Sequence, residues 1–255
     1  LETNPPLRST MLLRWLLWPA ARSLALTSGG VVLALAASNF TVPAKWQGKR
    51  TILHFGAVDY ESQVFINGAP AGAHRGGSDP FSFDITEFVK SGANEIVVHV
   101  SDPTSTGDQA RGKQTLKPEG IWYTAVSGIW QTVWLEQVPA TRIDRIRWTP
   151  NLERWEIGCA AWCVGPRDEH LRLRVRLTVQ GLPLAEDLYS VTGEEVHRRI
   201  ALSDPGIDDS RNELLWNPGR PRLIDAELTL ERDGVAVDRV RSYTALRSVA
   251  VDGNH

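Results

Sequence analysis

The chain has 255 residues, a formal charge of −2 and an apolar fraction of 42%. This apolar content excludes a disordered chain, and the length is sufficient for one or two domains that each bury a core. The charge supplies no overall basic field for nucleic acid or an anionic membrane surface, so we expect neither as a partner.

Residues 1–38 differ in pattern from everything that follows. An apolar segment containing Arg14 and Arg22 is followed by Leu24–Ala37, which carries no charge. This run is shorter than the roughly 20 residues of a membrane-spanning helix, so we expect no stable membrane span. It suits the apolar region of a signal peptide. We expect residues 1–38 to be a leader outside the folded domains, either a signal segment or non-native sequence. The protein is exported if residues 11–38 are a true signal and cytoplasmic otherwise.

From Phe40 onward the pattern is that of short β-strands. Asn67–Gly68 stands between two apolar runs and is the signal of a two-residue hairpin, because both positions need a positive φ. In the segment "PFSFDIT", Phe81, Phe83 and Ile85 alternate with polar residues and share one face. We assign residues 39–138 to a first β-domain.

A long polar stretch, Asp102–Gly120, interrupts this domain and leads into "GIWYTAVSGIWQTVWLE". Long loops inside compact domains are usually functional or mobile. Trp122 and Tyr123 fall in the loop portion, where an aromatic ring can face a cleft. We therefore predict that both contact a ligand.

The second part of this cluster, Gly128–Glu136, is expected to be one continuous strand. Because residues two positions apart share a face of a strand, alternation places Ile129, Gln131, Val133 and Leu135 on the core face. Trp130 and Trp134 then share the outer face and form an apolar patch that needs a partner. We predict a docking surface there.

Residues 140–251 are assigned to a second β-domain. Within "HLRLRVRLTVQG", four aliphatic residues face one side and Arg172, Arg174 and Arg176 face the other. The arginine row fits either a polyanion site or a solvated sheet face, and we favour the sheet face. Asp233–Gly234 predicts another hairpin. Regular short strands without helical alternation indicate sandwiches and exclude a parallel eight-stranded barrel.

The chain has two cysteines, Cys159 and Cys163. In a strand they would be about 13 Å apart, which exceeds the reach of a disulfide. A zinc site needs more ligands at tighter spacing. We therefore read both as small apolar core residues and expect no metal and no cofactor.

The segments "HFGAVDY", "ING", "PFSFDIT" and "SGIWQ" occur in an order that resembles the sugar-binding domain of glycoside hydrolase family 2, which includes β-galactosidases and β-glucuronidases. Residues 213–251 resemble the family's next domain. The resemblance implies an all-β fold: a jelly-roll (galactose-binding-like) β-sandwich followed by an immunoglobulin-like β-sandwich. It also implies a β-glycoside partner and a catalytic barrel that is missing after Gly253. The family's usual opening strand is replaced by the leader, so the first domain is expected to lack an edge strand.

The family's acid/base glutamate lies in an "NE" pair, but Asn212–Glu213 precedes the turn of the second domain and is a false match. We assign no catalytic residue and expect the chain alone to be inactive, although the parent family hydrolyses β-glycosides with retention. The resemblance also implies that Trp122 stands where β-galactosidase-like members carry an aspartate that reaches the sugar. His74 and Arg75 lie in a second candidate loop, although a strand histidine with satisfied hydrogen bonds is the simpler interpretation of His74. The alternatives are a free-standing carbohydrate-binding module and a structural or adhesion protein.

Overall fold

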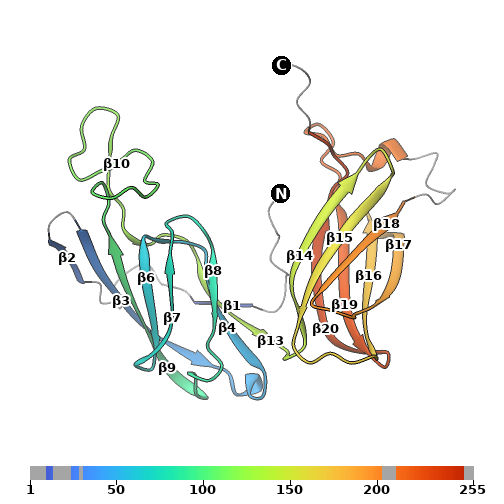
Figure 1. Ribbon diagram of the computed structural model, residues 1–255, viewed down its shortest axis with the longest axis horizontal. Coiled ribbons are helices and arrows are strands. Elements are labelled where there is room, and N and C mark those ends of the chain that lie inside the picture. Colours follow the sequence, from blue (N-terminus) through green and yellow to red (C-terminus); the bar gives the residue numbers. More distant parts are fainter. Residues whose placement is uncertain (1–9, 14–23, 29–30, 203–210, 250–255) are drawn as a thin grey trace. The chain divides into compact units, whose positions relative to one another are not determined.

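The computed structural model describes residues 10–13, 24–28, 31–202 and 211–249, and nearly all of its regular structure is β (Figure 1). The chain forms two compact units, one built from Ser9–Val138 and the other containing the chain from Pro139 onward. We call them the first and the second unit. The expected all-β fold of two sandwiches is confirmed. Among the described residues, no helix combines the length and the apolar character needed to cross a bilayer.

The first unit is a sandwich of a five-stranded sheet, in the order β2-β3-β9-β6-β7, and a four-stranded sheet, in the order β1-β13-β4-β8. Leu53 and Phe55 of one sheet and Val64 and Val98 of the other are fully buried in one core. The strands of these two sheets are β1 Thr10–Leu13, β2 Leu24–Ser28, β3 Val31–Val42, β4 Arg50–Phe55, β6 Glu61–Ile66, β7 Ala69–Arg75, β8 Phe81–Asp84, β9 Gly92–Asp102 and β13 Val133–Val138, with the 3-10 turn η1 at Ala44–Trp46.

Strand β3 differs from the expectation that residues 1–38 lie outside the domains. It pairs antiparallel with β9 from Val32, opposite Asp102, to Val42, opposite Gly92, and β2 pairs with its other side. An uncharged run of this length fits a strand inside a sheet as well as a signal peptide, and periodicity alone cannot separate the two. Residues 1–9, 14–23 and 29–30 of the expected leader lie outside the described residues.

The edges of both sheets in the first unit are also occupied, contrary to the expected missing edge strand. β1 pairs with β13, with Thr10 opposite Glu136, and is the outer strand of the four-stranded sheet. β2 is the outer strand of the five-stranded sheet. The segment before Phe40 therefore supplies strands that the sequence pattern did not indicate.

Two predicted hairpin turns have the backbone that the sequence requires. Asn67 and Gly68 have φ values of 50° and 82°, and Asp233 and Gly234 have values of 51° and 75°. Gln180–Gly181 forms a third turn of this kind, with φ values of 50° and 80°. Glutamine is not a usual residue at positive φ, so the sequence pattern does not predict this turn.

The second unit is a sandwich of a three-stranded sheet, in the order β14-β15-β18, and a four-stranded sheet, in the order β17-β16-β19-β20. Ile146 and Ile157 of one sheet pack in one core with Leu173 and Leu228 of the other. The strands are β14 Arg142–Asn151, β15 Glu156–Val164, β16 Leu171–Val179, β17 Leu182–Ser190, β18 Glu195–Ala201, β19 Ile224–Arg232 and β20 Val235–Thr244, with the 3-10 turn η2 at Arg211–Leu214. A division of seven strands into three and four occurs in immunoglobulin-like domains. Here β17 lies beside β16 instead of extending the sheet of β15 and β18.

The two cysteines are free and buried in the core of the second unit. Burial raises the pKa of the Cys159 thiol to about 12 and that of the Cys163 thiol to about 11. Thiols with such values are unreactive at neutral pH. This agrees with their interpretation as small apolar core residues.

The arginine row of β16 is a solvated sheet face whose charges are paired. Arg174 contacts Glu231 at 2.6 Å and Glu186 at 2.8 Å, and Arg176 lies 3.8 Å from Glu186. The alternating aliphatic residues Leu171–Leu177 are buried, as expected. The carboxylates come from the neighbouring strands β17 and β19, so the row is not a polyanion site.

Candidate functional site

The expected continuous strand Gly128–Glu136 is interrupted, and this break creates the end of the first unit that we consider as a site. β12 (Gly128–Ile129) pairs with β5 (Val58–Asp59), and β13 begins only at Val133. At Gly56 an added Cβ would lie 2.7 Å from the Cβ of Gln131, so a glycine is needed where these two segments of the backbone meet. Gln131 is exposed, so the expected core face begins at Val133.

Trp130 lies in this break and contacts the loop that follows β7. Its indole Nε1 donates a hydrogen bond of 2.7 Å to the carbonyl oxygen of Gly77. An added Cβ at Gly77 would lie 2.6 Å from Oδ1 of Asp59. The Gly77 loop, Trp130 and Asp59 therefore meet at one end of the sandwich, which we call the Asp59 rim.

The long loop after β9 is attached to the same rim through Gln114. Gln114 belongs to β10 (Gln114–Thr115), which pairs with β11 (Tyr123–Thr124). Its Nε2 donates to Oδ2 of Asp59 over 3.5 Å, and its Oε1 accepts from the backbone N–H of Val126 over 2.6 Å. The loop that carries the predicted ligand contacts is thus tied to Asp59 by one side chain.

Asp59 carries an unusual charge environment. Burial, together with the negative charge of Asp102, raises its pKa, and the hydrogen bond from Gln114 acts in the opposite direction. Asp102 itself is buried and accepts hydrogen bonds from the Thr104 N–H at 2.6 Å and from the Ser127 hydroxyl. A partly desolvated carboxylate with free lone pairs is a strong acceptor for hydroxyl groups.

Trp122 and Tyr123 are exposed, as their place before the strand suggested. Their exposed fractions are 44% and 67%. The Tyr123 N–H donates to the carbonyl oxygen of Lys113 over 2.9 Å, so the backbone is fixed although the rings are exposed. Further exposed apolar side chains accompany them in this part of the chain: Leu116, Ile121, Val126 and Trp130. A concentration of this kind indicates a surface that meets a partner or a ligand.

His74 and Arg75 end β7 beside the Gly77 loop, and both differ from simple expectations. The ring of His74 stacks on Phe81 at 4.0 Å, and its Nε2 is buried without a hydrogen bond among the described residues. The interpretation of His74 as a satisfied strand histidine is therefore wrong. Arg75 is engaged locally, with Glu61 at 3.2 Å and the face of Tyr60 at 5.5 Å.

Trp130 and Trp134 do not form one patch on one strand, because the chain breaks between them. Trp134 lies on β13, half-buried, and its ring stacks in parallel on His54 at 4.8 Å. His54 in turn shares a hydrogen bond of 3.0 Å with Glu136. A docking role for Trp130 and Trp134 remains a proposal, and each would act from a different place.

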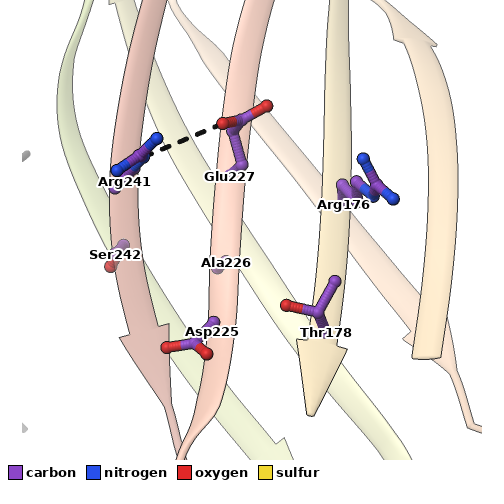
Figure 2. A pocket seen from close by; sticks show the side chains of 7 residues that line it. All are labelled: Arg176, Thr178, Asp225, Ala226, Glu227, Arg241 and Ser242. Carbon is purple, nitrogen blue, oxygen red and sulfur yellow. Dashed lines mark ion pairs between the residues drawn. The ribbon is translucent and has the colours of Figure 1, made fainter. Parts of the chain in front are cut away.

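The second unit has a shallow hollow on the outer face of β16, β19 and β20, shown in Figure 2. Its charged side chains are Arg176, Asp225, Glu227 and Arg241, and Arg241 lies 3.9 Å from Glu227 (Figure 2). Two arginines and two carboxylates balance one another. The hollow has no aromatic side chain on which a sugar could stack.

Glu213, the false match to the family's "NE" pair, lies in η2 and is exposed. Its nearest ionic partner is Arg220 at 3.8 Å. The part of the chain that the structure describes contains no group of three or more His, Cys, Asp or Glu side chains that could hold a metal ion.

Comparison with known proteins identifies the first unit. Residues 27–139 match the family model described as "Glycosyl hydrolases family 2, sugar binding domain". These residues are a family 2 sugar-binding domain. The matched region begins within β2 and includes all of β3, in agreement with the strand pairing described above.

Relatives of the family 2 domain extend the similarity into the second unit. The chain is 27% identical over 201 residues to a putative β-glucuronidase of Formosa agariphila, covering 76% of this chain and 22% of the relative. It is 25% identical over 226 residues to a β-galactosidase of Thermoanaerobacter pseudethanolicus, covering 83% of this chain and 28% of the relative. The chain thus spans about a quarter of the length of these two relatives.

A solved structure of Bacteroides uniformis β-glucuronidase 2 superposes with a TM-score of 0.66 at 24% identity. The superposition covers 85% of this chain and 26% of that chain. At this identity the similarity concerns the fold, and it includes both units of the present chain.

Sequence reasoning missed Asp59, Gln114 and Trp130 as members of one site. Asp59 follows an apolar strand and looks like an ordinary turn residue in the sequence. Gln114 is one polar residue in a polar loop. Only the pairing of β10 with β11 and of β5 with β12 brings them together.

Proposed function

We propose that the chain is a non-catalytic portion of a retaining β-glycoside hydrolase, in which the Asp59 rim contacts the carbohydrate. The observation that carries this proposal is the meeting of Asp59, Trp130 and the Gly77 loop at one end of the sugar-binding domain. Hydrolysis itself is assigned to a separate catalytic domain of the whole protein. A retaining glycosidase needs two carboxyl groups about 5–5.5 Å apart across the bond, and neither unit is assigned such a pair.

The rim offers the two kinds of contact that sugars use. Asp59 accepts hydrogen bonds from ring hydroxyls, and burial raises its pKa, which favours the protonated form that can also donate. Trp122 and Tyr123 present exposed rings for the apolar face of a sugar. His74 adds a buried nitrogen close to the Gly77 loop that has no hydrogen-bond partner in the described part of the chain.

The same end of the domain is proposed to support the catalytic domain. Exposed apolar side chains between Leu116 and Trp130 are too many for a surface that faces only water. Trp134, held against His54, supplies a rigid second contact on β13. In this proposal the domain shapes the edge of the substrate cleft and does no bond chemistry.

Binding measurements with matched variants test the carbohydrate contact. Ligand-observed NMR with β-galactosides and β-glucuronides is applied to the whole chain and to the Trp122→Ala and Asp59→Asn variants. Tyr243→Ala is the control, because Tyr243 has the same exposed fraction as Trp122, 44%, but lies on β20 of the second unit. We expect both rim variants to lose the signal and the control to keep it. Equal binding signals in the wild type, both rim variants and the control would contradict a carbohydrate contact at the Asp59 rim.

Hydrolysis assays separate this proposal from its alternatives. The chain alone is expected to release no nitrophenol from nitrophenyl β-galactoside, β-glucuronide or β-mannoside. Turnover that survives repurification and disappears in Glu213→Ala would contradict it. Tight sugar binding by the isolated chain would favour a free-standing carbohydrate-binding module, and no binding to any glycoside would favour a structural protein.

A further inference from the structure

The outer face of the three-stranded sheet in the second unit is grooved along its central strand. On β15, Gly158 and Ala160 face outward and have almost no side chain. In the register of the sheet, Gly158 lies between Thr149 of β14 and Arg199 of β18, and Ala160 lies between Arg147 and His197. Long side chains flank a floor of small residues on both sides of an open surface hollow of about 570 Å³, which we call the arginine trough.

The arginine trough is positively charged and its charge is not balanced internally. Its lining contains the arginines Arg147, Arg154 and Arg199 against the carboxylates Glu153 and Glu156. A fourth arginine of the lining, Arg198, pairs opposite the core residue Cys159, and its guanidinium lies 5.1 Å from the ring centroid of Tyr189. Among the described residues, no carboxylate forms an ion pair with any of these arginines. Exposed sheet arginines elsewhere on this unit do find partners, as Arg174 does with Glu186 and Glu231.

The hollow in Figure 2 is the internal comparison for this trough. It lies on the other sheet of the same unit and also contains two arginines, Arg176 and Arg241. There Glu227 lies 3.9 Å from Arg241 and Glu186 lies 3.8 Å from Arg176. On that sheet face each arginine of the hollow therefore has a glutamate within 4 Å. The arginines of the trough have no such partner among the described residues.

The nearby acidic residue Glu195 is held away from the trough arginines by other groups. It accepts from Nε1 of Trp162 over 2.6 Å and is 2.9 Å from Nε2 of His197. These two hydrogen bonds lower the pKa of Glu195 and keep it ionised. Arg145 and Arg147 lie over the ring of Trp162 at 3.9 Å and 5.7 Å, so this indole already serves as a cation-π partner.

We propose that the arginine trough binds an acidic saccharide chain, with carboxylates of the sugar placed between Arg147 and Arg199 above the Gly158–Ala160 floor. This inference rests on the proposed function, since the carbohydrate nature of the ligand comes from it. Guanidinium groups bind carboxylates through paired hydrogen bonds, and Thr149 and Asn151 supply polar contacts for ring hydroxyls. Such a site would hold a uronate-containing polymer on the second unit and favour acidic substrates.

Titration calorimetry of the whole chain with an oligogalacturonate hexamer tests the charge. The fully methyl-esterified hexamer is the matched ligand without carboxylates. We expect binding of the acidic hexamer only, weakened about tenfold in the Arg147→Gln/Arg199→Gln double variant, since two exposed ion pairs together contribute about that factor. The Arg176→Gln/Arg241→Gln double variant, with the same change in net charge, should bind like the wild type. Equal loss in both double variants, or equal binding of the esterified hexamer, would overturn the proposal.

Filling the floor tests the shape without changing the charge. Ala160→Leu places a larger side chain between Arg147 and His197, and we expect it to weaken binding as much as removal of the arginines does. Thr149→Phe, at an exposed position of the same wall, is the second variant if Ala160→Leu melts early. If Ala160→Leu or Thr149→Phe folds and binds the acidic hexamer with unchanged affinity, the binding is nonspecific ion exchange. That result would overturn the proposed site. Neutral β-glycoside binding, measured in the same variants, reports on the Asp59 rim separately and should be unaffected.

Discussion

Trp130 donates its indole N–H to the backbone carbonyl of Gly77 over 2.7 Å, although 53 residues separate them. This bond joins the loop after β7 to the break between β12 and β13. Because an added Cβ at Gly77 would approach Asp59 within 2.6 Å, the bond also fixes the loop beside the carboxylate. The arrangement makes the Asp59 rim a single structure built from three separate parts of the sequence.

Removing this hydrogen bond should loosen the rim without unfolding the domain. Trp130→Phe keeps an aromatic ring but loses the donor, and Trp130 is 48% exposed. We expect a loss of about 1 kcal/mol in the free energy of unfolding, the usual contribution of one hydrogen bond. Glycoside binding should weaken by more than this stability change alone explains. Denaturant titration and ligand-observed NMR on the same samples measure both, and unchanged binding would show that the Gly77 loop does not contact sugar.

The raised pKa of Asp59 predicts a specific dependence of stability on pH. Burial and the charge of Asp102 hold this pKa above its ordinary value of 3.8. The folded protein therefore keeps the Asp59 proton to higher pH than the unfolded chain, and this group lowers the free energy of unfolding as pH rises above 3.8. The free energy of unfolding of the wild type minus that of Asp59→Asn should therefore become more negative as pH rises from about 4 to about 7.

Asp84→Asn is the control with the opposite sign. Burial alone would raise the pKa of Asp84, but hydrogen bonds from Thr86 and Arg50 outweigh it and lower that pKa. Ionised Asp84 therefore stabilises the fold, and this contribution is lost as pH falls below 3.8. Denaturant titrations across the pH range should give slopes of opposite sign for the two variants. Parallel curves would contradict the charge environment described for Asp59.

Trp122 and Trp134 should separate ligand contact from packing. Trp122 is 44% exposed, so Trp122→Ala should change the free energy of unfolding by less than about 0.5 kcal/mol. Trp134 is half-buried and stacked on His54, so Trp134→Ala should cost about 1–2 kcal/mol. Thermal melts compare the two. If Trp122→Ala melts like a core deletion, its ring packs inside the domain and cannot serve as a sugar platform.

The position of β3 predicts strong protection of a segment that resembles a signal peptide. Leu35–Val42 pairs with β9 along its whole length, inside the five-stranded sheet. Amide hydrogens that pair with β9 should exchange as slowly as those of β6, and limited proteolysis should leave this segment intact. Hydrogen–deuterium exchange with peptide-level readout measures this. Rapid exchange across Leu35–Val42, with protection elsewhere in the sheet, would mean that the folded domain begins near Asn39.

Two leucines of the second unit test the core that alternation predicted. Leu173 on β16 is fully buried, whereas Leu182 at the start of β17 is 71% exposed. Leu173→Ala should cost about 2–5 kcal/mol, while Leu182→Ala should stay within about 0.5 kcal/mol. Denaturant midpoints of the two variants give the comparison. Similar midpoints would mean that the core face of β16 is assigned wrongly.

The sequence determined the strand content, the hairpins and the core faces because these depend on neighbouring residues. Asn67–Gly68 and Asp233–Gly234 form turns wherever a chain must reverse in two residues. The alternation from Leu171 to Leu177 fixes which side of β16 is buried. The family resemblance came from such local segments in a fixed order.

Only the tertiary structure decided which residues of the sugar-binding domain meet. The strand predicted from Gly128 to Glu136 breaks at Trp130 because β5 pairs with Gly128–Ile129, whereas Gly56 bonds to Thr132 beyond the break, and this pairing is invisible in the local pattern. The uncharged segment before Phe40 became β3 because β9 lies beside it, although its composition alone also fits a signal peptide. Contacts between Asp59, Gln114 and Trp130's loop depend on distances across the sheet, and one-dimensional periodicity carries no information about those distances.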